Sequence, residues 1–130
     1  LAAKRGVDVR IYTPGVPDKP TIYQLTRSYF PHLLRAGVKI YSYTPGFLHA
    51  KTWLVDDRIA AVGTVNLDYR SLYLHFENSV LIYGGAVLDD VRRDLAEIEK
   101  ESAAVTLADC RTGFFGTLYS AVLRLVAPLC

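Results

Sequence analysis

One stretch of the chain reads His49-Ala50-Lys51-Thr52-Trp53-Leu54-Val55-Asp56. Its apolar run predicts a β-strand over residues 49–55, and a tight turn is expected to follow at Asp56. Because side chains alternate between the two faces of a strand, His49 and Lys51 are expected to project from the same face. An imidazole beside a fixed ammonium group suits chemistry at a phosphate ester. The lysine would attract the phosphoryl oxygens, and the imidazole would act as nucleophile, acid or base.

The hydrophobic pattern around this stretch predicts strands that alternate with helices. Further strands are expected at residues 7–12, 38–43, 59–62 and 76–83. Helices are expected up to residue 27, from residue 30 to Gly37 with Pro31 in the first turn, over 87–98 and briefly over 106–109. This alternation indicates a single α/β domain over residues 1–130, with a mixed β-sheet flanked by helices.

The composition is that of an ordinary globular domain. Of 130 residues, 51% are hydrophobic and 22% are charged, which excludes a disordered chain. The net charge of +2 favours anionic partners only slightly. Cys110 and Cys130 have no metal-ligand spacing, and two distant cysteines do not establish a disulfide. No apolar run is long enough to span a membrane.

The chain opens as if in the middle of a fold. Leu1-Ala2-Ala3-Lys4-Arg5-Gly6 resembles the last turn of a helix closed by a glycine, and a strand follows at once. The sequence also contains no methionine. We therefore expect it to be a piece of a longer protein.

A family resemblance rests on three segments. His49, Lys51 and Asp56 match the H-x-K-x-x-x-x-D signature of the phospholipase D superfamily in every fixed position. The segment from Gly63 to Ser71 resembles that family's G-[ST]-x-N segment in the form found in bacterial cardiolipin synthases, and residues 76–78 match a later acidic position. The likeness covers nearly the whole chain and is weakest over residues 14–19 and beyond Thr112. It implies a phospholipase D-like domain.

The resemblance also implies a role for each matched residue. His49 would be one of two active-site histidines, of which one attacks phosphorus and the other protonates the leaving alcohol. The nucleophile usually comes from the first motif, so the resemblance favours His49 as the acid and then the base. Lys51 and Asn66 would hold the non-bridging phosphate oxygens. Glu77 would accept a hydrogen bond from His49 and stabilise the imidazolium.

Other matched residues are expected to be structural. Asp56 falls on the opposite face from Lys51 by strand parity, so we expect it to bind local backbone or a basic side chain. Asp68 and Ser71 would either support the phosphate loop or simply form a turn. No metal and no cofactor are expected, because lysines supply the positive charge that a cation would otherwise bring.

The superfamily's active site needs two such motifs, and this chain has one. His32 and His75 lack a lysine two positions later. The resemblance therefore implies the C-terminal half of a two-motif enzyme, inactive or nearly so alone. Its partner would be the missing N-terminal half or, as in small superfamily members, a second copy. The parent enzyme would act at the bacterial cell membrane and join two phosphatidylglycerol molecules into cardiolipin, releasing glycerol.

Two other functions compete with this hypothesis. One is a homodimeric phosphodiesterase or nuclease, although no basic, aromatic-studded groove for nucleic acid is evident. The other is a domain that binds phosphate or lipid without turnover. The apolar stretch over residues 114–129 has two expected fates: it lies in a bilayer interface, or it packs on the sheet of the domain.

Overall fold

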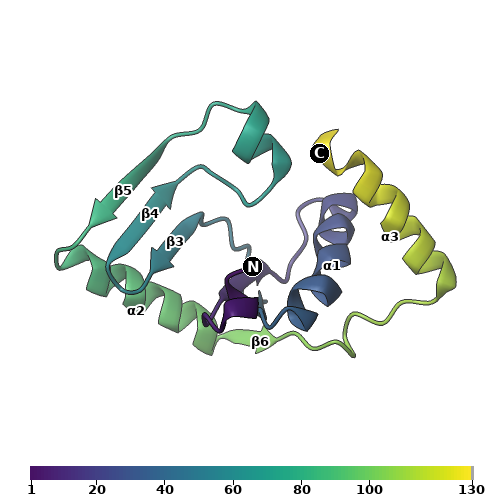
Figure 1. Cartoon of the computed structure of the whole chain (residues 1–130), viewed down its shortest axis with the longest axis horizontal. Coiled ribbons are helices and arrows are strands. Elements are labelled where there is room, and N and C mark those ends of the chain that lie inside the picture. Colours follow the sequence, from purple (N-terminus) through teal and green to yellow (C-terminus); the bar gives the residue numbers. More distant parts are fainter. Residues whose placement is uncertain (130) are drawn as a thin grey trace.

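The computed structural model describes residues 1–129, so Cys130 and any disulfide made by it lie outside the described residues. Residues 1–129 form two three-stranded sheets and three α-helices (Figure 1). The predicted α/β class is confirmed, with the strands divided between two sheets. No helix within residues 1–129 combines the length and the apolar character needed to cross a membrane.

The first sheet is built on a strand–helix–strand unit. Strands β1 (Arg10–Pro14) and β2 (Lys39–Tyr43) are parallel, so a crossover must join them, and α1 (Pro20–Arg35) provides it. Strand β6 (Ser102–Ala104) pairs antiparallel with the other edge of β2. The sequence did not predict β6, because a Ser-Ala-Ala segment has no strand pattern. It becomes a strand where the chain passes the free edge of β2.

Strand β1 begins at Arg10, three residues later than predicted. The Val7 N–H bonds back to the Ala2 carbonyl at 3.3 Å, which holds residue 7 in the preceding turn. Of the three residues predicted to face inward, Val9 and Ile11 do so, whereas Val7 is 52% exposed. Val9 and Ile11 pack against Ile40 in the main hydrophobic cluster.

Helix α1 runs unbroken from Pro20 to Arg35. The prediction of two helices, with a break between residue 27 and residue 30 ahead of Pro31, was therefore wrong. A proline inside a helix removes one backbone donor, and tertiary packing offsets this loss here. Leu25 and Phe30 are both buried, and the Arg27 guanidinium lies 5.7 Å from the centroid of the Phe30 ring. Gly37, at φ 91°, follows the end of the helix as predicted.

The second sheet is an antiparallel meander of β3 (Thr52–Val55), β4 (Ile59–Gly63) and β5 (Ser79–Tyr83). The predicted tight turn is present between the first two strands. Asp56 and Asp57 both have φ 52°, as a type I′ hairpin turn requires, and Arg58 N–H bonds to the Val55 carbonyl at 3.0 Å.

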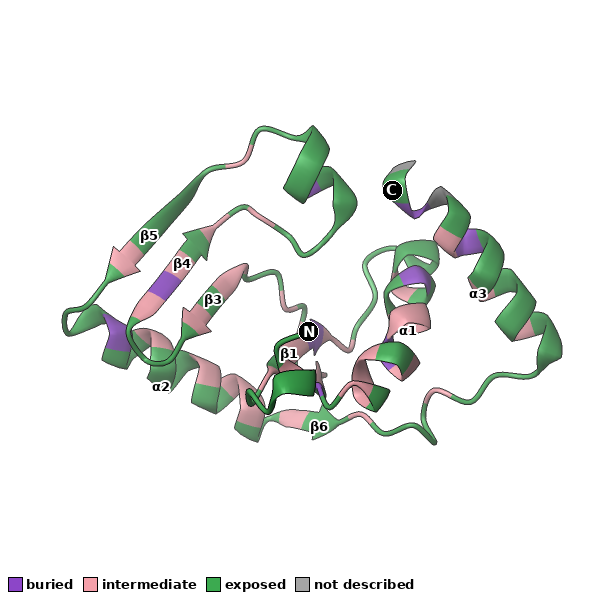
Figure 2. Cartoon of the chain, in the orientation of Figure 1, coloured by how far each residue is buried: buried purple, intermediate pink, exposed green. Residues whose placement is uncertain are grey.

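Only one face of this second sheet is covered. Leu54, Ala60 and Ile82 share a face by register, and Ala60 is only 1% exposed. Helix α2 (Val87–Lys100), which agrees with the predicted amphipathic helix, packs against β4 and carries the buried Leu88. The opposite face remains open (Figure 2), with Leu81 71% exposed.

The last helix, α3 (Phe114–Val126), lies beside α1 and is followed by a short helical turn, Ala127–Leu129. Leu123 and Ala127 form a small buried cluster with Leu25. The helix thus packs on another helix, and not on the sheet. The brief helix expected over residues 106–109 is a turn, in which the Asp109 carboxylate accepts bonds from the N–H and hydroxyl of Thr106 at 2.8 and 2.6 Å.

A polar network ties the end of α2 to the first sheet. Arg10 Nη1 donates to Glu99 Oε2 at 2.9 Å, and the Tyr12 hydroxyl donates to the same carboxylate. The bond from Tyr12, followed by those from Arg10, lowers the pKa of Glu99, while burial and this carboxylate raise the pKa of Tyr12 to about 12. Hydrogen bonds from Arg10 and Lys39 lower the pKa of Asp8 to about 2. Glu99 therefore joins two elements that are distant in the sequence.

We predict that Glu99→Gln lowers the free energy of unfolding by about 1 kcal/mol at pH 7, because it removes the charge-assisted bonds of Arg10 and Tyr12. The stabilisation by ionised Glu99 is complete above its ordinary pKa and is lost as pH falls through its lowered folded-state pKa. The difference from wild type should therefore shrink on acidification. Urea denaturation at pH 7 and pH 3 measures it.

Glu97→Gln is the matched control, because Glu97 lies on the same helix and, within residues 1–129, its carboxylate forms an ion pair with Lys100 alone, at 3.5 Å. Its effect should be near zero. Equal effects of the two substitutions would contradict the structural role of Glu99.

Candidate active site

The strand register brings the motif segments to one end of the second sheet. There, Gly63 N–H donates to the Lys51 carbonyl at 3.2 Å, and Thr64 N–H donates to the Asn78 carbonyl at 3.0 Å. Lys51, Thr64 and Glu77 consequently meet where β3 starts, β4 ends and β5 starts. Asp56 lies at the opposite end, in the hairpin turn.

His49 and Lys51 precede the strand instead of lying in it, so the prediction of a strand over residues 49–55 was too long by three residues. The reason is that β4 ends at Gly63, and the next residue, Thr64, pairs with Asn78. No strand is left to pair with His49. The strand-parity argument therefore does not fix the direction of the His49 side chain.

The two motif side chains have definite local contacts. The His49 side chain is exposed, and its imidazole stacks on the Phe47 ring at 5.5 Å between centroids. The Lys51 ammonium folds back and donates to the His49 carbonyl at 2.8 Å. This bond to a neutral carbonyl is one that a phosphate oxygen would replace with a stronger, charge-assisted bond.

Glu77 is the half-buried acid at this end of the sheet. Its carboxylate accepts a hydrogen bond from the Thr64 hydroxyl, whose oxygen accepts the Asn78 N–H at 3.0 Å. Hydrogen bonds from Thr64 and then Ser71 lower the pKa of Glu77, with smaller electrostatic contributions from His75 and Lys51. Glu77 is therefore ionised at neutral pH and places a negative charge near the Lys51 ammonium.

The structure describes both Glu77 and His49, and the expected hydrogen bond between them is not formed. The imidazole that lies near Glu77 is that of His75, with Nδ1 3.9 Å from Oε1. Arg70 Nε donates to the other nitrogen of this ring at 3.1 Å. Sequence reasoning assigned no role to Thr64 or His75. Thr64 occupies the [ST] position of the G-[ST]-x-N segment, which is a usable signal, whereas His75 has none.

The remaining predicted residues lie in the connection between β4 and β5. The Asp68 carboxylate accepts the Ser71 N–H at 2.7 Å, at the start of a π-helical turn, Arg70–Leu74. Ser71 is buried, and its hydroxyl supports Glu77 as described above. Asn66 is exposed in the same connection. Asp68 thus holds the turn, and the turn positions Ser71 beneath the acid.

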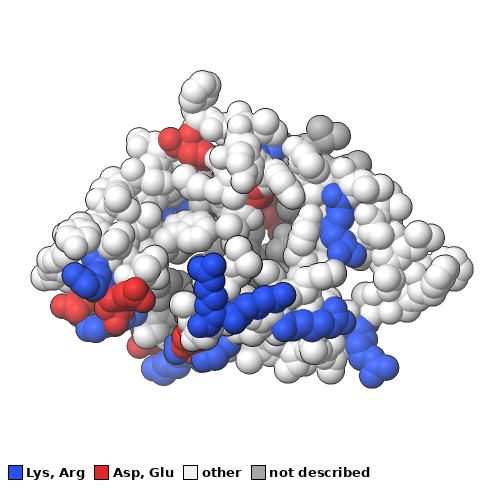
Figure 3. All heavy atoms as spheres, in the orientation of Figure 1, with Lys and Arg blue, Asp and Glu red and all other residues white. Residues whose placement is uncertain are grey.

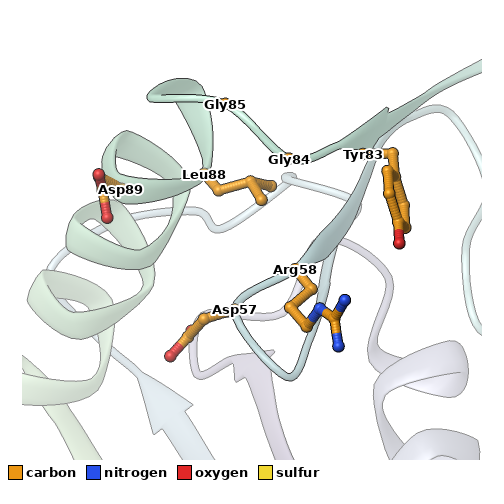
Figure 4. Close-up of a pocket in the computed structure, with 7 residues that line it drawn as sticks. All are labelled: Asp57, Arg58, Tyr83, Gly84, Gly85, Leu88 and Asp89. Atoms are coloured by element: carbon orange, nitrogen blue, oxygen red, sulfur yellow. The ribbon is translucent and has the colours of Figure 1, made fainter.

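A depression of about 260 Å³ lies at the other end of the second sheet (Figure 4). Its walls come from the β3–β4 turn, the end of β5 and the start of α2: Asp57, Arg58, Tyr83, Gly84, Gly85, Leu88 and Asp89. None of the motif residues from His49 to Lys51 or from Gly63 to Glu77 lines it. We therefore place the candidate active site at the Lys51–Glu77 end.

The comparison with protein families agrees with this site. Residues 1–98, which include every motif residue discussed above, match the family described as "Cardiolipin synthase, PLD-like domain". The chain is therefore a phospholipase D-like domain. It belongs to the cardiolipin synthase family of such domains.

Similar proteins are known over almost the whole chain. It is 42% identical over 130 residues to a cardiolipin synthase of Clostridium perfringens strain SM101, covering 99% of this chain and 27% of that protein. It is 39% identical to a cardiolipin synthase of Geobacillus kaustophilus, covering 99% and 26%. An uncharacterised protein of Streptococcus mutans is 51% identical, covering 99% and 28%. The chain thus spans little more than a quarter of these curated relatives.

A solved structure shows the same fold. The crystal structure of phosphatidylserine synthase from Haemophilus influenzae Rd KW20 matches 98% of this chain and 35% of that chain, with a TM-score of 0.71. The sequences are 18% identical. The likeness therefore concerns the arrangement of strands and helices.

We predict that Gly63→Ala destabilises the domain by about 1–3 kcal/mol, as overpacking does. A Cβ at Gly63 would lie 2.3 Å from the Asn78 carbonyl oxygen and 2.5 Å from the Ser79 Cα, so β4 and β5 would have to separate at the site. Urea denaturation measures the loss. Gly46→Ala is the control, because a Cβ there meets nothing within 4 Å, and equal losses would refute the close approach.

We predict that Thr64→Val raises the pKa of Glu77, because it removes the strongest hydrogen bond to the ionised carboxylate. A carboxyl-detected NMR titration should show the Glu77 midpoint at higher pH than in wild type. Thr64→Ser keeps a hydroxyl and should leave the midpoint near the wild-type value. An unchanged midpoint in Thr64→Val would show that the hydroxyl does not stabilise the carboxylate.

Proposed function

We propose that this domain supplies one half of the active site of a cardiolipin synthase, a phosphatidyltransferase. The observation that carries the proposal is the convergence of the Lys51 cation, the ionised Glu77 and the exposed His49 segment at one end of the second sheet. The names of the relatives from Clostridium perfringens and Geobacillus kaustophilus support the same activity.

The proposed reaction has two displacements at one phosphorus. A histidine nitrogen attacks the phosphorus of a first phosphatidylglycerol, and the bond from phosphorus to the head-group glycerol oxygen breaks. A second histidine donates a proton to that oxygen, so glycerol leaves and a phosphatidyl-histidine remains. The now neutral second histidine takes the proton from a hydroxyl of another phosphatidylglycerol. That oxygen attacks the phosphorus, the bond to the first histidine breaks, and cardiolipin is formed.

In this scheme His49 is the second histidine, which acts as acid and then as base. Its exposed imidazole is accessible to a head group. Binding of substrate would release the Lys51 ammonium from the His49 carbonyl. The Lys51 ammonium and the Asn66 amide would then bind the non-bridging oxygens, where charge accumulates during transfer.

The scheme needs a second histidine motif, which this chain lacks. In the sequence, Leu34 and Glu77 stand two positions after His32 and His75, where the motif has its lysine. We therefore propose that residues 1–130 are one domain of a two-motif enzyme and that the other histidine comes from another part of the parent protein. A second copy of this chain is the alternative source. The parent protein would work at the bacterial membrane, where its substrate is found.

We predict that the chain forms cardiolipin from phosphatidylglycerol only when mixed with a domain that supplies the other motif. In that mixture, His49→Ala should lower the rate by at least about 10³-fold, because it removes the general acid and base. Thin-layer analysis of radiolabelled lipid measures product, and light scattering measures the mass of the chain in solution.

His32→Ala is the matched control, because His32 is an exposed histidine on α1 and should leave the rate unchanged. Turnover by the chain alone, as a dimer and with loss on His49→Ala, would instead assign the second histidine to another copy. Absence of turnover in every mixture, with lipid binding retained, would replace the proposed enzyme by a binding domain.

A further inference from the structure

Helix α3 has one broad apolar face, and only one edge of it is buried within the domain. Leu123 lies in the buried cluster with Leu25 on α1. Successive residues of a helix are about 100° apart around its axis. Six other apolar side chains of α3 therefore fill an arc of roughly 140°, and Leu123 lies outside this arc. These residues are all exposed: Phe114, Phe115, Leu118, Tyr119, Val122 and Leu125.

This arc is called here the α3 outer face and is defined by those six residues. It is broad and uncharged. Phe115 and Leu125, near its two ends, are 82% and 81% exposed. Figure 2 shows the outer side of α3 in green along most of its length. An amphipathic helix of a globular domain normally buries its apolar face, so the exposed part of this face indicates a further partner.

Charge identifies the kind of partner. From Cys110 to Leu129 the sequence contains Arg111 and Arg124 and no acidic residue. In Figure 3, the side of the visible surface that α3 occupies shows no red Asp or Glu among the described residues. An apolar stripe with aromatic rings and basic residues alone is complementary to an anionic lipid surface.

A second apolar feature lies near the end of α3, on the side of the candidate active site. Between the end of α3 and the π-helical turn lies a cleft of about 420 Å³, lined by Tyr69, Tyr73, Leu74 and Pro128. The same turn carries Ser71, whose hydroxyl supports Glu77. A lipid layer that contacts α3 and this turn would therefore lie next to the place where a phosphate head group is expected.

We propose that the α3 outer face and this cleft form a docking surface for a bilayer that contains anionic phospholipid. The proposal rests on the proposed function, in which the substrate is such a lipid. With 13 residues, α3 is about 20 Å long, which is less than the hydrocarbon thickness of about 30 Å. The helix therefore lies along the membrane surface, with its outer face among the acyl chains and α1 on its other side.

The test is sedimentation of the 130-residue chain with vesicles of equal parts phosphatidylglycerol and phosphatidylcholine. The double variant Phe115→Ser/Leu125→Ser should bind at least roughly tenfold more weakly than wild type, since each substitution removes an apolar side chain from the acyl region. Wild type should also bind vesicles of phosphatidylcholine alone more weakly, because Arg111 and Arg124 then lose their anionic partners.

The control is Leu81→Ser/Tyr83→Ser, which removes two comparably exposed apolar side chains, 71% and 73% exposed, from the open face of the second sheet. Wild-type vesicle binding by this control supports the proposal. Equal losses in both double variants would overturn it, because binding would then follow total exposed apolar area.

A second copy of the chain is the other candidate occupant. A dimer in lipid-free buffer that Phe115→Ser/Leu125→Ser dissociates, with vesicle binding unchanged, would also overturn the proposal. Circular dichroism confirms that both double variants remain folded. The vesicle measurement needs no turnover, so a failure of the proposed enzymatic function would leave its result intact.

Discussion

The pairing of β4 with both of its neighbours is the constraint on which the candidate site depends. Gly63 closes this pairing, because only a residue without a side chain lets the Asn78 carbonyl approach so closely. Beyond Gly63 the β3 partner ends, and Thr64 bonds to Asn78 instead. The register of β4 with its two neighbours therefore ends β3 next to Lys51 and brings Glu77 to the same end of the sheet.

The chemistry of the site follows from hydroxyl groups as much as from charges. Thr64 and Ser71 lower the pKa of Glu77, and Ser71 is positioned by Asp68. The His49 imidazole is exposed and, among the described residues, has a stacking contact with Phe47 but no side-chain hydrogen bond. Under the proposed function, the second half of the enzyme and the substrate would complete the surroundings of the imidazole.

The domain leaves two apolar surfaces uncovered, and they differ in chemistry. The open face of the second sheet carries Trp53, Leu81 and Tyr83 on paired strands. The α3 outer face lies on a helix whose single charged residue, Arg124, is basic. Near the end of this helix, the apolar cleft leads to the π-helical turn next to the candidate site. Exposed apolar patches mark interaction sites, and the proposed docking of a bilayer concerns the α3 outer face.

The sequence by itself determined the α/β class, the β3–β4 hairpin and the identity of the motif residues, because hydrophobic period, turn chemistry and residue spacing are local properties. It did not determine that α1 runs through Pro31, that Ser102–Ala104 becomes a strand, or that Glu77 bonds to Thr64 and not to His49. Each of these depends on contacts between residues far apart in the chain or on strand ends set by a neighbour. Only the tertiary structure decides them, because their free energy comes from packing and pairing that no local pattern records.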